Sequence, residues 1–177
     1  FVPWFGSSDH MTFLEGIIGV PAVAMINWDD DYIHSSDDDL DKIDQTQLRR
    51  NAFIIGSMAH ALASAEAKDV PVFAGETFSQ GAKRLANDLQ AAMQMIAGAK
   101  GTSDDRWKEA TSMIEQGIQR EIRALNSSRV FTRGDKTTAQ TIDDLIDRMK
   151  KKETELTADL RSYYKRVRGS EPKSAKL

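Results

Sequence analysis

Two short segments near the start of the chain hold residue types that could bind a metal: the tripeptide Ser-Asp-His at 8–10 and the acidic segment 28–43. His34 lies in the second segment and is followed by two serines and three aspartates. A neutral imidazole can bind zinc at about 2.0–2.1 Å, and a neighbouring serine or Asp38 could orient its second nitrogen or the loop. For a single histidine the alternative, an exposed loop side chain beside carboxylates, is the commoner case.

The runs of aspartate at 29–31 and 37–39 also raise calcium as an alternative. A calcium loop of the usual kind needs alternating ligands, a central glycine and a distal glutamate, and the sequence here lacks them. The chain has no cysteine, which excludes thiolate ligands, thiol nucleophiles and disulfides. It also has no serine-hydrolase or phosphate-binding motif, so the sequence gives no support to serine hydrolysis or nucleotide chemistry.

The elements that must position this chemistry are a strand and a helix. The apolar run at 17–26 is bounded by glycine, proline and asparagine and predicts a strand buried on both faces of a parallel or mixed sheet. Ligands in open α/β sheets collect at the carboxyl ends of strands, where the acidic loop 27–41 follows. Asp44 or Thr46 can cap a helix over 47–65, whose apolar stripe would cover the sheet.

The rest of the chain has a helical pattern. Residues 68–75 break the periodicity and predict a domain boundary. Beyond them, three amphipathic helices are predicted, and their apolar faces would pack as an antiparallel bundle. Their expected ranges are 76–97, 103–125 and 138–167.

Charge is distributed unevenly between the two parts. Residues 1–66 carry eleven acidic and three basic side chains, whereas 67–177 carry sixteen acidic and twenty-one basic ones. This asymmetry indicates two separate units. The basic part has mixed charges and few aromatic residues, which disfavours nucleic-acid binding. No apolar run approaches the ~18 residues of a membrane-spanning helix.

Three linked motifs favour the metal-ligand interpretation of His34. They are Ser-Asp-His at 8–10 with Phe13, Gly-Val-Pro-Ala at 19–22, and the segment 34–43. In order and spacing they resemble the final catalytic segment of metallopeptidase family twenty-eight, the aminopeptidase and glutamate-carboxypeptidase-like enzymes. The match covers about residues 1–66.

In that family two zinc ions are held by two histidines, two aspartates and a glutamate, and a further glutamate is the general base. The resemblance implies that His34 is the last of these ligands. The other ligands and the base lie upstream of the matched segment in the family. We therefore expect the chain to be the C-terminal part of a longer enzyme and to be inactive alone.

The resemblance also implies roles for neighbouring residues. Tyr32 would be a catalytic residue whose phenol stabilises an oxyanion, with a tyrosine at the pocket rim as the alternative. His10 and Asp9 would form part of the substrate pocket. Asp38 would lie beside the zinc ligand and orient its imidazole or the loop.

The expected fold class is therefore α/β: a C-terminal remnant of a zinc-exopeptidase mixed sheet with a covering helix, followed by an α-helical bundle. Three regions are expected: residues 1–69 as the end of the catalytic domain, 70–168 as a helical accessory domain and 169–177 as a flexible tail.

The expected substrate is a peptide, hydrolysed by a zinc-activated water, and the resemblance favours a secreted or periplasmic location. Two alternatives stay open. One is a non-catalytic interaction module, in which the bundle binds a partner or self-associates. The other is a relative of glutaminyl cyclase, an acyltransferase that uses one zinc ion.

Overall fold

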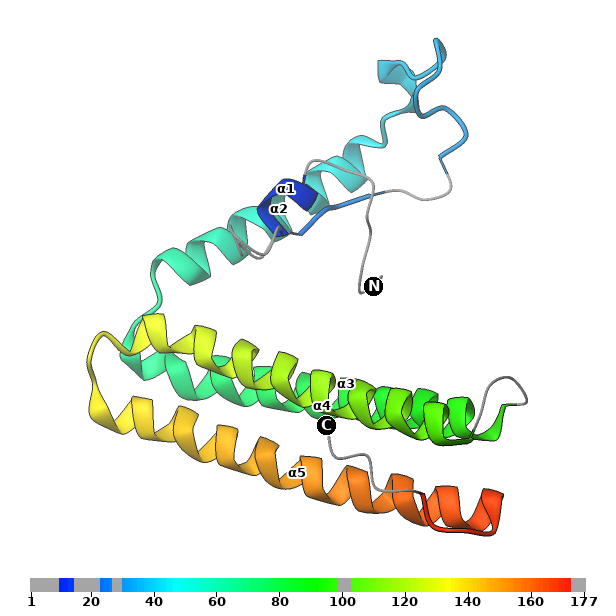
Figure 1. Cartoon of the computed structure of the whole chain (residues 1–177). Helices are drawn as coiled ribbons and strands as arrows, with labels where there is room; N and C mark the ends of the chain where they lie inside the picture. Colours follow the sequence, from blue (N-terminus) through cyan, green and yellow to red (C-terminus); the bar gives the residue numbers. More distant parts are fainter. Residues whose placement is uncertain (1–9, 15–22, 27–29, 99–102, 173–177) are drawn as a thin grey trace. The chain divides into compact units, whose positions relative to one another are not determined.

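The computed structural model describes residues 10–14, 23–26, 30–98 and 103–172 (Figure 1). The chain divides into two compact units, Phe1–Ala63 and Ser64–Leu177. The sequence had placed this boundary after residue 69. Within the described residues, every helix is too short or too polar to cross a bilayer.

The described part of the chain is helical and contains no strand, so the predicted α/β fold with a mixed sheet is wrong. Residues 23–26, the described end of the predicted strand 17–26, have irregular backbone, and the rest of that run lies outside the described residues. An apolar run reports a preference for burial, whereas a strand also needs a neighbour that pairs with its backbone groups. No such neighbour is present among the described residues.

The first unit contains the helix α1 (His10–Leu14), the 3₁₀ turn η1 (Leu40–Lys42) and the helix α2 (Gln45–Ala63). The predicted cap at Asp44 is confirmed, because its carboxylate accepts hydrogen bonds from the backbone of Thr46 at 2.7 Å and of Gln47 at 3.2 Å. The apolar stripe of α2 is exposed and covers no sheet in the described structure. Four of its members are 45–58% exposed: Leu48, Ile55, Met58 and Leu62.

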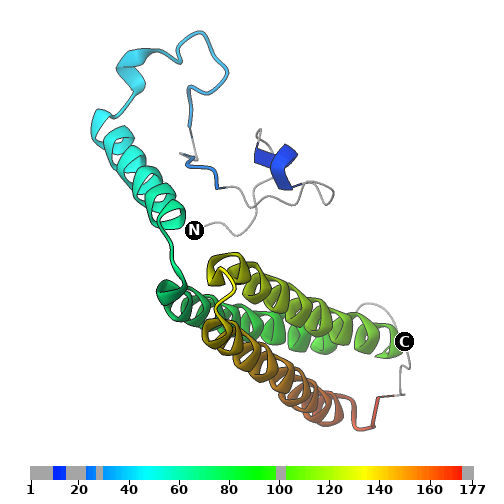
Figure 2. The ribbon, with the colours of Figure 1, turned by 90° about the vertical axis from the view of Figure 1, so that its left-hand side faces the viewer.

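The second unit is built from three long helices that run antiparallel in sequence order (Figures 1 and 2). They are α3 (Val70–Ala97), α4 (Ser103–Ser127) and α5 (Lys136–Arg168), preceded by η2 (Ala67–Asp69) and interrupted by η3 (Ser128–Thr132). The three predicted helices are confirmed, with wider bounds. Helix α3 begins six residues before its predicted start, inside the segment 68–75, because Pro71 lies in the first turn, where the helix needs no N–H donor.

The core of the bundle comes from one apolar face of each helix. Its members recur at helical spacing and are almost fully buried, as are Leu85 on α3, Ile118 on α4 and Leu160 on α5. An edge-to-face pair of aromatic rings packs near each end of the bundle. The rings of Phe73 and Phe131 lie 5.6 Å apart, and those of Trp107 and Tyr164 lie 5.4 Å apart.

One interface of the bundle holds charge. Glu121 on α4 is only 1% exposed and belongs to an ionic cluster with Arg84, Asp88 and Arg120. Burial raises the pKa of the Glu121 carboxyl, but hydrogen bonds and charges from Arg84 and Arg120 lower it by more, and its pKa lies below the ordinary 4.5. The carboxylate is therefore ionised at neutral pH despite its burial.

The bundle should fold by itself, because the described residues of its core all belong to the second unit. Residues 64–177 produced alone are expected to give a strongly helical circular dichroism spectrum and one cooperative thermal transition. A disordered spectrum, or a gradual loss of signal on heating, would show that the bundle depends on the first unit.

The ionic cluster predicts how stability depends on pH. Because the folded-state pKa of Glu121 lies below its unfolded value of 4.5, the stabilisation is present above that pH and is lost as the pH falls through the folded-state pKa. Glu121→Gln should lower the free energy of unfolding by about 1–3 kcal/mol at neutral pH, and the loss of stability on acidification should become shallower. Chemical denaturation at a series of pH values measures both effects.

The matched control is Glu171→Gln, which removes an exposed ion pair with Lys165 and should change stability little. If the free energy of unfolding of Glu121→Gln fell with decreasing pH as steeply as that of the unmodified chain, Glu121 would not be the source of the acid sensitivity.

Candidate metal and substrate site

The backbone around His34 forms a tight turn. The N–H of Ser35 donates to the carbonyl of Tyr32 at 3.0 Å, which places Ile33 and His34 at the two central positions. His34 has a φ of 63°, in the left-handed region. A positive φ at the second central position is typical of a type II turn, where glycine or asparagine is usual and other residues are uncommon. The imidazole is thus carried at an exposed corner, in a backbone conformation that is uncommon for residues other than glycine.

Short-range hydrogen bonds hold the loop on both sides of this turn. The carboxylate of Asp30 accepts from the N–H of Tyr32 at 2.9 Å, and the hydroxyl of Ser35 accepts from the N–H of Asp37 at 3.1 Å. Such side-chain turns are common for aspartate and serine. Ser35, one of the residues considered for orienting the imidazole, therefore binds the backbone of its own loop.

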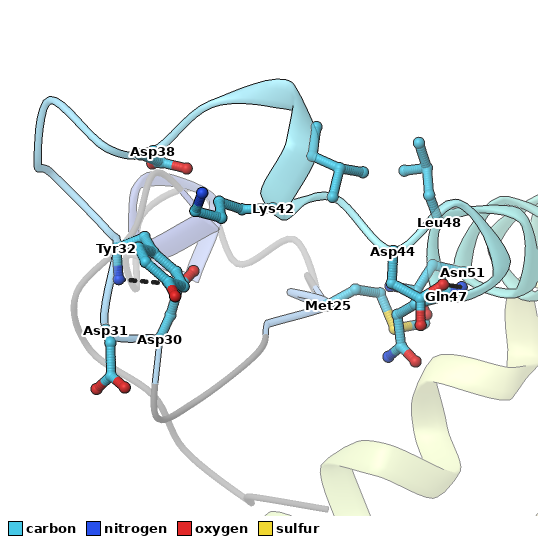
Figure 3. Close-up of a pocket in the computed structure, with 11 residues that line it drawn as sticks. Met25, Asp30, Asp31, Tyr32, Asp38, Lys42, Asp44, Gln47, Leu48 and Asn51 are labelled. Carbon is cyan, nitrogen blue, oxygen red and sulfur yellow. Dashed lines mark hydrogen bonds between the residues drawn. The ribbon is translucent and has the colours of Figure 1, made fainter.

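A pocket of about 490 Å³ opens between the acidic loop and the start of α2 (Figure 3). Tyr32 and Asp38 line it, whereas His34 is not among the described residues that form its wall. The ammonium of Lys42 lies 5.1 Å from the centre of the Tyr32 ring and 2.6 Å from a carboxylate oxygen of Asp41. The other lining residues are Met25, Asp30, Asp31, Ile43, Asp44, Gln47, Leu48 and Asn51.

The pocket draws on residues that the sequence analysis missed. Asp30 fixes the backbone at Tyr32, because its carboxylate accepts a hydrogen bond from the Tyr32 N–H. Aspartate commonly accepts from the N–H two residues later in a turn, and this preference could have identified Asp30 from the sequence. Leu48 and Asn51 contribute because they stand three residues apart on one face of α2. Their place in a pocket wall depends on how the loop lies against the helix, which spacing alone does not give.

The described residues do not assemble a complete metal site. No group of three or more histidine, aspartate or glutamate side chains converges in the part of the chain that the structure describes. His34 lies in the exposed turn, and His10 is partly buried at the start of α1. Asp9 lies outside the described residues. A zinc site of either the structural or the catalytic kind uses at least three protein ligands, so the described residues around His34 do not form one.

Comparison with family models, with curated proteins and with solved structures finds no match to this chain.

The geometry predicts weak zinc binding by the 177-residue chain alone. With His34 separated from other ligands in the described structure, isothermal titration with zinc should give no tight stoichiometric binding, and an aminopeptidase assay should show no turnover. His34→Ala should leave the titration almost unchanged. Tight binding of two zinc ions with turnover would show that the chain forms a complete site.

Proposed function

We propose that this chain contributes a zinc ligand and part of the substrate pocket to a zinc-dependent exopeptidase, an aminopeptidase of the kind found in metallopeptidase family twenty-eight. The observation that carries the proposal is the position of His34 within three ordered motifs. Its left-handed turn conformation adds support, because uncommon backbone conformations persist where the surrounding structure holds them and are frequent at functional sites.

His34 is suited to be one zinc ligand, since its side chain is exposed and its turn is held by a backbone hydrogen bond. The remaining ligands and the general base would come from other segments of the same polypeptide, as the resemblance implies. When bound, the zinc ions would supply a water of lowered pKa for attack on the scissile carbonyl. Tyr32 would donate its phenol proton toward the developing oxyanion.

The charges around the pocket favour a peptide substrate that binds through its free N-terminal ammonium group. Among the described residues that line the pocket, four are aspartates and one, Lys42, is a lysine. A concave surface with an excess of carboxylates attracts cations, and the α-ammonium group of a peptide is a cation located beside the first peptide bond. The acidic wall would therefore suit an aminopeptidase better than an enzyme that binds a free C-terminal carboxylate. The four aspartates are Asp30, Asp31, Asp38 and Asp44.

A second candidate function is a non-catalytic interaction module. It is favoured by the exposed apolar face of α2 together with the separately packed helical bundle. In that case His34 would not bind a metal. The two candidates differ in a measurable way, because only the peptidase requires His34 for zinc content and hydrolysis.

We expect His34→Ala in the complete enzyme to abolish hydrolysis of aminoacyl chromogenic substrates and to lower the zinc content, while circular dichroism stays unchanged. Loss of a protein ligand weakens metal binding and frees the ion to rearrange. The matched control is His60→Ala on α2, which removes a histidine outside the three motifs and should keep both zinc and activity. Unchanged zinc content and rate in His34→Ala would refute the ligand assignment and favour the interaction module.

A further inference from the structure

We propose that the ionic cluster is a conformational device that fixes the register of α3 against α4. Its two carboxylates are each seated over a glycine of the facing helix, and two arginines hold them there. Glu121 of α4 lies over Gly81 of α3, and Asp88 of α3 lies over Gly117 of α4.

The seat of Glu121 is closely fitted. A Cβ atom added at Gly81 would lie 2.8 Å from Oε2 of Glu121, closer than real Cβ atoms approach, and 3.2 Å from its Cδ, which is tighter than most real contacts. Arg84 donates to both carboxylate oxygens, from Nη2 to Oε2 at 2.6 Å and from Nε to Oε1 at 3.0 Å. This two-point pairing fixes orientation as well as distance. The carboxylate therefore occupies the space that the missing side chain at residue 81 leaves open.

The seat of Asp88 mirrors the first. A Cβ atom at Gly117 would lie 2.7 Å from Oδ2 of Asp88. Arg120 connects the two seats, since its Nη2 donates to Asp88 at 2.9 Å and its Nε donates to Glu121 at 2.7 Å. Each helix thus supplies one glycine, one carboxylate and one arginine.

This reciprocity makes the cluster specific for one register. A shift of α3 along α4 by one turn, about 5.4 Å, would bring Glu121 against the side chain of Thr77 or Leu85 in place of Gly81, and would separate it from Arg84. A buried carboxylate without its partner is strongly unfavourable. Apolar contacts discriminate less, because aliphatic side chains recur at the same helical spacing before and after each contact. Buried polar groups that select one register are known from coiled coils.

The first test asks whether a glycine-to-alanine substitution raises or lowers the thermal midpoint of the chain. Replacing a glycine inside a helix with alanine ordinarily stabilises the helix. Gly75→Ala, on the same helix and with open space around it, should therefore raise the thermal midpoint of the chain. Gly81→Ala should lower it, because the new methyl group displaces Glu121 from its seat. In a Glu121→Ala background, Gly81→Ala should raise the midpoint like the control.

The second test measures the register directly. Since the chain has no cysteine, Ser79→Cys on α3 and Lys108→Cys on α4 give one clean pair of sites for spin labels, both exposed and separated along the bundle axis. Pulsed electron paramagnetic resonance on the otherwise unmodified chain should give a single narrow distance. Adding Glu121→Ala should broaden it or add a second population displaced by up to about one helical turn.

The proposal is overturned if Gly81→Ala raises the midpoint as Gly75→Ala does, or if a folded Glu121→Ala chain keeps the single unchanged distance. Apolar packing alone would then set the register. If Glu121→Ala fails to fold, the comparison of the two glycine variants in the unmodified background decides the matter by itself.

Discussion

The second unit depends on the burial of one apolar face of each long helix against the other two. Leu85, Ile118 and Leu160 lose almost all contact with solvent in this interface, and each buried aliphatic side chain contributes about 1.5–3 kcal/mol. Polar groups drawn into the same interface must be paired, because an unpaired buried carboxylate opposes folding. The ionic cluster meets this requirement for Glu121, whose two oxygens accept hydrogen bonds from Arg84 and Arg120.

The ends of the bundle face a related constraint, since the last carbonyls of a helix have no partner within it. At the end of α3, the guanidinium of Arg168 donates to the carbonyls of Ile96 and Gly98. Its positive charge also suits the C-terminal end of a helix dipole. The same end is covered by Trp107 against Tyr164, with Arg161 stacked 5.5 Å from the centre of the Trp107 ring. At this end of the bundle, the same region therefore holds both the aromatic contact and the hydrogen bonds to the last carbonyls of α3.

The acidic loop is organised differently. Within its described residues, the hydrogen bonds that backbone N–H groups donate join residues two or three positions apart, such as Asp30 with Tyr32 and Tyr32 with Ser35. Local bonds of this kind can fix the direction in which His34 leaves the backbone. They cannot bring distant ligands together, which requires elements that pack across the site. The proposed peptidase function therefore needs partners for His34 that the loop does not itself provide.

The sequence alone determined the elements whose cause is local. The periodicity of apolar residues predicted α3, α4 and α5, and the position before an apolar stripe left Asp44 and Thr46 as the possible caps, of which the structure uses Asp44. The motif spacing also indicated His34 as a candidate ligand, and the resemblance implied a role for Tyr32; both stay predictions. Its largest error was the mixed sheet, because an apolar run indicates burial and only a neighbouring strand can supply the backbone pairing that a sheet needs.

Tertiary structure alone decided the role of Glu121. On a helix this charged residue resembles any solvated side chain, and Gly81 and Gly117 resemble ordinary weak points in helices. Their meaning appears only when α3 and α4 lie side by side, because the space left by each glycine is filled by a carboxylate from the other helix. Contacts between residues about 30 to 40 positions apart are set by packing in three dimensions, and no local pattern in the sequence encodes which pairs will meet.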